Sequence, residues 1–83
     1  MTELARTPKQ LGNLIRRARK SQRLSQAQLG MKTGLRQATI SEIEAGHPGA
    51  KLDSILNVLA ILNLEIRIGS RSIGSLTDIE SLF

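Results

Sequence analysis

The sequence is short and basic: 83 residues carry 12 Lys and Arg against 7 Asp and Glu, which gives a formal net charge of +5 and a length suited to one domain. With no Cys and a single His, it excludes disulfides and offers no cluster with metal-ligand spacing, so we expect no metal and no cofactor. The first twenty residues are too polar for a signal peptide and the longest apolar run, residues 58–62, is too short to span a membrane, so we expect a cytoplasmic protein with no membrane contact.

The first predicted helix begins near residue 8. Thr7 can cap it, Pro8 suits the first helical position, and Gln10 completes a capping box. Apolar residues follow at positions 11, 14, 15 and 18, which is the spacing of one helix face. This pattern predicts a helix that runs to about residue 21 or 22.

Two shorter helices are predicted between residues 25 and 46. Ser25 and Gln28 form a second capping box, and the helix that they open runs to about residue 33, where Gly34 supplies a left-handed turn. The third helix spans about residues 37–45 and ends at Gly46. Three apolar residues of these helices are expected to face the core: Leu29, Ile40 and Ile43.

A fourth helix is predicted over residues 52–62, and eight of its eleven residues are apolar. The stripe at positions 52, 55, 56 and 59 suffices for packing on the first three helices. Val58 and Ile61 then form an additional apolar surface, and a helix that is apolar all round must be buried on more than one side. We expect a second copy of the chain to cover that surface.

Residues 64–68 alternate between apolar and charged side chains, which is a strand pattern. No other segment offers a partner strand, and a lone strand is unstable in water. An antiparallel pairing of two copies centred on Ile66 sets Glu65 opposite Arg67 of the second copy. The predicted homodimer interface therefore contains Val58, Ile61, Leu64, Glu65, Ile66, Arg67 and Ile68.

The last segment, residues 70–83, is rich in Gly and Ser and is expected to be a flexible tail behind a domain of residues 1–69. It ends in Leu82 and Phe83. Phe83 is the only aromatic residue of the chain, so this pair is our candidate anchor for a protein partner. The alternative is a disordered end with no partner.

Residues 24–46 have the features of a helix-turn-helix unit, in which two short helices are joined by a tight turn that contains Gly. Gly34 supplies the turn, and Gly30 is small where the two helices cross closely. This arrangement points the third helix outward, where its first turn can enter a major groove of duplex DNA. The N-terminus of the second helix faces the phosphate backbone.

Charge is distributed in a way that fits this interpretation. Residues 1–36 carry nine bases and one acid, for a net charge of +8, whereas residues 37–83 carry −3. Such asymmetry suggests a polyanionic partner, and the near absence of aromatic residues argues against single-stranded nucleic acid or RNA. A solvated helix face is the alternative interpretation of the basic residues.

Residues 11–62 resemble the Cro/C1/Xre-type repressor domains through Leu-Ser-Gln-Ala-Gln-Leu at 24–29 and Ala-Thr-Ile-Ser-Glu-Ile-Glu-Ala-Gly at 38–46. Through Arg-Gln-Ala-Thr-Ile-Ser at 36–41 and the apolar helix that runs into residues 64–68, about residues 8–68 of the chain are similar to the HipB-type antitoxins of HipA-type serine/threonine kinase toxins. The fold expected is all-α: a compact four-helix, lambda-repressor-like helix-turn-helix domain, with one short C-terminal strand that pairs across a homodimer. The resemblance implies an operator-binding homodimer that also holds a kinase toxin.

Five residues at the start of the third helix are predicted to contact bases. Arg36 can donate two hydrogen bonds to guanine, and Gln37 can pair with adenine. The remaining three are Ala38, which can touch a thymine methyl group, and Thr39 and Ser41, which can reach a base edge or a phosphate. A plain phosphate contact is the alternative for Arg36.

Phosphate contacts are predicted at Ser25, Gln26 and Lys32. The resemblance implies that Gln26 touches a phosphate and braces Gln37. Glu42 is an acid on a DNA-facing helix; it can accept from cytosine, but we expect it to point away.

Other polar residues are assigned to structure. Arg19 and Glu44 occupy positions that often form an ion pair between the first and third helices of this family. His47 has no catalytic partner and is expected to fill a loop. Gly30 and Thr33 depart from the family pattern, in which Ala and an apolar residue are usual.

Three functions are consistent with these residues, and none is enzymatic. The first is a sequence-specific repressor that binds a palindromic operator and serves as the antitoxin of a HipA-like kinase. The second is a stand-alone Xre-type repressor without a toxin. The third is an adaptor that binds only protein.

Overall fold

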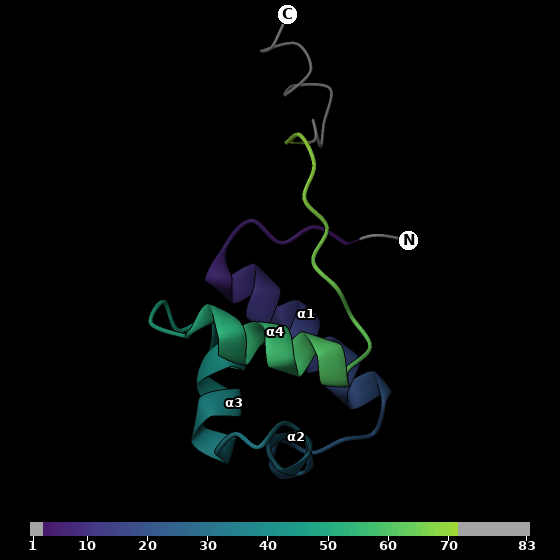
Figure 1. Cartoon of the computed structure of the whole chain (residues 1–83), viewed down its shortest axis with the longest axis vertical. Coiled ribbons are helices and arrows are strands. Elements are labelled where there is room, and N and C mark those ends of the chain that lie inside the picture. The colour runs from purple at the N-terminus through teal and green to yellow at the C-terminus, as the bar shows by residue number, and fades with distance from the viewer. Residues whose placement is uncertain (1–2, 72–83) are drawn as a thin grey trace, which may run out of the picture.

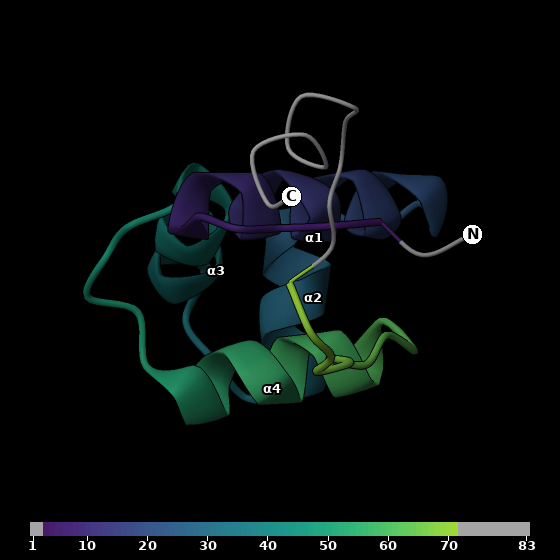
Figure 2. The ribbon, with the colours of Figure 1, turned by 90° about the horizontal axis from the view of Figure 1, so that it is seen from above.

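The structure is a computed structural model that describes residues 3–71. It contains four helices, α1 (Pro8–Ser21), α2 (Gln26–Thr33), α3 (Gln37–Ala45) and α4 (Leu52–Ile61), and no strand forms within the described residues. Figure 2 shows α1 and α4 on either side, with α2 and α3 spanning the space between them (Figures 1 and 2). The predicted all-α helix-turn-helix fold is confirmed, and the helix ends lie within one residue of their predicted positions.

Local capping explains where the helices begin. The Ser25 hydroxyl accepts the N–H of Gln28, and the Gln28 side chain accepts the N–H of Ser25, so the predicted capping box of α2 is complete. The box of α1 is half formed. Thr7 accepts the N–H of Gln10 as predicted, but the Gln10 side chain accepts the N–H of Arg6 instead of that of Thr7.

Residues with positive φ end all four helices. Gly34 and Gly46 have φ values of 74° and 80°, as the sequence predicts for the ends of α2 and α3. After α1 and α4 the same conformation falls on Arg23 and Asn63, at 59° and 60°. At each of these positions the N–H of the next residue, Leu24 or Leu64, donates to a carbonyl oxygen of the last helical turn, which would otherwise lack a donor.

The core lies where the four helices meet. Its buried apolar residues are Ile15, Leu29, Ile40, Ile43, Val58, Leu59 and Leu62. The predicted core positions of α2 and α3 are confirmed.

The predicted packing face of α4 is wrong in part. Leu52 and Leu56 were expected in the core but are 63% and 46% exposed, whereas Val58 is fully buried within the single chain. Val58 therefore presents no surface to a second copy, and Ile61, at 39% exposed, is the one predicted interface residue of α4 at the surface. The helix is apolar on so many sides that its pattern did not single out the face that packs.

Residues 64–71 leave the end of α4 and run away from the helices (Figure 1). Leu64, Ile66 and Ile68 are all exposed in the single chain, and the side chains of Glu65 and Arg67 form an ion pair at 2.9 Å. This pair places both charges on one side of the extended segment, as alternation predicts. Pairing with a second copy remains a prediction.

The predicted anchor, Leu82 and Phe83, lies outside the described residues, as does most of the predicted tail. Across residues 3–71, no helix has both the length and the apolar character needed to cross a bilayer.

Gly12 lies at a close approach of α1 to α3, which sequence analysis missed. A Cβ atom there would meet the carbonyl oxygen of Ile43 and would lie 2.5 Å from that of Glu44. We expect Gly12→Ala to lower the free energy of unfolding by about 1–3 kcal/mol, because overpacking outweighs the gain in helix propensity. Urea denaturation measures this, with Asn13→Ala, at an exposed position of the same helix, as the control. Equal stability of the two variants would contradict the close approach.

Candidate nucleic-acid interface

The start of α3 is exposed. Arg36 is the N-cap residue, but its side chain makes no capping hydrogen bond and is exposed. Gln37, Ala38 and Ser41 are also exposed and Thr39 is partly buried, whereas Ile40 and Ile43 pack into the core. The structure thus brings the five predicted base-contacting residues together at the start of α3, where all but Thr39 are exposed. Glu42 is exposed on the same helix.

The N-terminus of α2 is the second part of the site. Helix geometry leaves the first N–H groups of α2 without intrahelical acceptors, and Ser25 and Gln26 stand at this end. Lys32 is exposed in the last turn of the same helix. Such an end favours an anion, because N–H groups and the helix dipole both point toward it.

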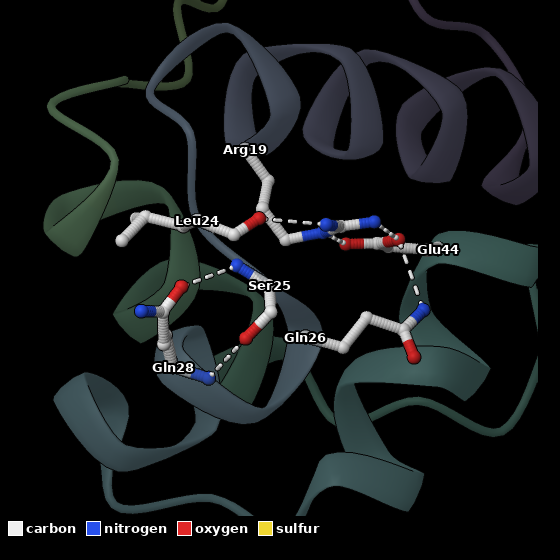
Figure 3. Close-up of polar contacts among 6 residues, drawn as sticks. All are labelled: Arg19, Leu24, Ser25, Gln26, Gln28 and Glu44. Carbon is white, nitrogen blue, oxygen red and sulfur yellow. Dashed lines mark hydrogen bonds and ion pairs between the residues drawn. The ribbon is translucent and has the colours of Figure 1, made fainter.

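Gln26 is held differently from the prediction. Its side-chain nitrogen Nε2 donates to Oε1 of Glu44 at 3.2 Å (Figure 3), so it braces against the end of α3 and not against Gln37. A carboxylate can only accept, so this contact fixes Nε2, rather than the carbonyl oxygen, as the amide atom that faces Glu44. The second N–H of Nε2 remains available to an external acceptor.

The predicted ion pair between α1 and α3 is confirmed. Arg19 donates through Nε to Glu44 Oε2 at 2.6 Å and through Nη2 to Oε1 at 3.0 Å, and its Nη1 donates to the carbonyl of Leu24 at 2.8 Å (Figure 3). Both side chains are more than 90% buried. The hydrogen bond to Glu44 raises the pKa of Arg19, despite the opposing effect of burial, so the guanidinium stays charged throughout the physiological pH range.

Thr33 and Asn57 hold the turn between α2 and α3. The Thr33 hydroxyl donates to the carbonyl of Leu29 and accepts the N–H of Leu35, and Asn57 of α4 donates to the carbonyl of Thr33 at 2.8 Å. The polar residue at position 33, unusual for the family pattern, therefore has a structural use here. Sequence analysis missed Asn57, because nothing local links it to a turn 24 residues away.

Two further residues match their structural assignments. A Cβ atom on Gly30 would lie 2.8 Å from the carbonyl oxygen of Leu35, so the small residue is needed at the crossing. His47 accepts the N–H of Gly49 through Nδ1 at 3.1 Å, which closes the loop before α4.

In this fold α2 and α3 pack across each other, and the start of α3 is exposed. This arrangement defines a DNA-binding helix-turn-helix regulator. Residues 15–68 match the helix-turn-helix family HTH_3. The chain belongs to this Xre-type helix-turn-helix family, and it is a transcriptional regulator of that class.

Two curated relatives come from Sinorhizobium fredii (strain NBRC 101917 / NGR234), and both are uncharacterized HTH-type transcriptional regulators. The y4mF regulator is 37% identical over 68 residues, which are 82% of this chain and 90% of the relative. The y4dL regulator is 37% identical over 59 residues, which are 71% of this chain but 30% of the relative.

Solved structures of HipB have the same fold. A HipB variant in complex with an O2 20mer superposes with a TM-score of 0.79 at 29% identity, covering 87% of this chain and 100% of that chain. A HipA-HipB-O2-O3 complex also gives a TM-score of 0.79, at 27% identity, covering 86% and 100% of the two chains.

Proposed function

We propose that this protein is a sequence-specific repressor that binds a palindromic duplex operator as a homodimer and acts as the antitoxin of a HipA-like serine/threonine kinase. The observation that carries the DNA-binding part is the exposed first turn of α3, where Arg36 and Gln37 have no structural task in the described residues. Similarity to HipB in complexes with 20mers and with HipA supports the operator and the kinase partner.

In this proposal, the residues of α3 contact the bases. Arg36 pairs with guanine and Gln37 with adenine, Ala38 lies against a thymine methyl group, and Thr39 and Ser41 contact a base edge or a phosphate. Ser25, Gln26 and Lys32 contact phosphates and set the register of the helix in the groove. A two-fold homodimer in the cytoplasm presents two such helices to the two half-sites of a palindrome, about one helical turn apart.

Arg36→Ala and Gln37→Ala should each weaken operator binding by roughly 1–3 kcal/mol, because a bidentate base contact is lost. The loss should be confined to the cognate base pair, so that preference at one operator position is relaxed. Competition binding against operators substituted at single positions measures both effects.

Lys32→Ala is the matched control, since it removes a phosphate contact in place of a base contact. It should weaken all sequences alike and reduce the dependence of affinity on salt. If Gln37→Ala leaves both operator affinity and base preference unchanged, α3 is not the reading helix.

The kinase part of the proposal has a separate test. A HipA-like kinase should co-purify with the full chain from its native cells, and the two proteins together should retard operator DNA in a gel mobility-shift experiment. Operator binding without a kinase favours a stand-alone Xre-type repressor. A chain that binds protein but no duplex DNA at low salt is an adaptor.

A further inference from the structure

A hollow of about 550 Å³ lies outside the proposed reading surface, between the first half of α1 and the end of α3. Figure 2 shows this half of α1 alongside α3. The residues that line the hollow are Thr7, Lys9, Gln10, Asn13, Arg16, Glu44 and Ala45.

The hollow carries two cations that have no structural task. Lys9 and Arg16 are exposed, and within residues 3–71 neither forms an ion pair. The next base of α1, Arg17, differs in this respect, because it pairs with Glu3 at 3.1 Å. Lys9 and Arg16 lie seven residues apart, which is two helical turns, so they share one face of α1.

The one acid in the lining does not cancel this charge. Both oxygens of Glu44 accept hydrogen bonds from Arg19, and Oε1 also accepts from Gln26. The pair is neutral as a unit, so the hollow keeps the positive charge of its two free cations.

Neutral donors complete the lining. The side-chain oxygen of Gln10 is occupied by the N–H of Arg6, which leaves its NH₂ group to donate, and the amide of Asn13 is exposed. Cations beside amide donors suit a phosphate oxygen, and among the described residues of the lining the single carboxylate, that of Glu44, is already paired with Arg19.

The hollow and the proposed phosphate contact of α2 are linked through one residue. Glu44 lines the hollow and is also the residue that holds the side chain of Gln26. Glu44 therefore lies between Gln26 and the hollow, so a phosphodiester strand that touches Gln26 at the N-terminus of α2 runs next to the hollow that holds Lys9 and Arg16.

We propose that this hollow is an additional phosphate site for the operator backbone, in which Lys9 and Arg16 neutralise phosphates beside those held at α2. The inference rests on the proposed DNA-binding function, and it extends the interface from the helix-turn-helix unit to α1. The site takes backbone and not bases, so it strengthens binding to every duplex.

The test is the salt dependence of binding to a fluorescent duplex of about 30 base pairs with arbitrary sequence, between 50 and 200 mM salt. The hollow variant is Lys9→Gln with Arg16→Gln. Two lost phosphate contacts should make the slope of log affinity against log salt shallower by about 1.8. The loss of affinity between 50 and 200 mM salt should then be about twelvefold smaller than for the wild type. The control, Arg17→Gln with Arg71→Gln, removes the same charge elsewhere and should keep close to the wild-type slope.

Two further variants show whether a changed slope reflects the lost positive charge or damage to the fold. Arg16→Gln alone should lower the slope by about 0.9, and Lys9→Arg with Arg16→Lys should preserve it. Equal slopes for the hollow variant and the control overturn the inference while leaving the proposed function intact. Failure of the wild type to bind any duplex overturns both. A hollow variant that keeps the wild-type slope but no longer binds the kinase assigns the hollow to protein contact and also overturns the inference.

Discussion

Glu44→Ala should lower the free energy of unfolding by about 3–5 kcal/mol, because it leaves the Arg19 guanidinium charged, buried and without its carboxylate. Stability of roughly 0.05–0.15 kcal/mol per residue is ordinary for small domains, so a loss of this size is a large fraction of the folding free energy. The contact between α1 and α3 should loosen first, and Gln26 should lose the acceptor that orients its side chain.

Urea denaturation at neutral pH measures this loss, and a double-mutant cycle identifies its source. Replacing Arg19 and Glu44 together by Met should cost less than the sum of the single replacements, since the double variant leaves no unpaired buried charge. The effect should persist at high salt, because a pair buried this deeply is poorly screened. A loss below about 1 kcal/mol for Glu44→Ala, or strict additivity in the cycle, would mean that the ion pair does not stabilise the contact between α1 and α3.

The parts of the fold that sequence predicted well are those encoded by neighbouring residues. Caps and turn glycines act over three or four positions, so Ser25 with Gln28, Gly34 and Gly46 fixed the ends of α2 and α3 in advance. The positive φ of Arg23 was not predictable, because Arg carries no turn signal. That of Asn63 was missed, although Asn is one of the few non-Gly residues that often adopt this conformation at the end of a helix.

The packing of α4 was not predictable from its own pattern. In an amphipathic helix the pattern of apolar residues identifies the buried face, but α4 is apolar on nearly every side. Packing against the other three helices therefore decides that Val58 is buried and that Leu52 and Leu56 are exposed. The candidate interface was predictable in part. Its exposed residues followed from their position on α3, whereas the bond from Gln26 to Glu44 and the hollow beside α1 depend on contacts between distant segments.

The burial of Val58 changes which residues can pack against the predicted dimer strand. Val58 belongs to the core, so the apolar residues available to a second copy are Ile61 at the end of α4 and Leu64, Ile66 and Ile68 beyond it. In an antiparallel pairing centred on Ile66, Leu64 meets Ile68 of the second copy and Ile66 meets itself on the two-fold axis. On the other side, Glu65 and Arg67 exchange their internal ion pair for pairs between the chains.

Ile66→Asp should therefore abolish the dimer at micromolar concentration. It sets two carboxylates against each other on the axis of an apolar face, at a cost of about 3 kcal/mol or more, which is roughly 100-fold or more in the dimer Kd. Ile66 is 46% exposed in the single chain, so the monomer should stay folded, and operator affinity should fall because the two recognition helices are no longer linked. Ile66→Val should behave like the wild type, and Glu65→Ala should cost only about 0–1 kcal/mol, as exposed ion pairs do. Sedimentation equilibrium with operator binding on the same samples measures both effects, and a monomeric wild type, or a dimer indifferent to Ile66→Asp, contradicts the strand pairing.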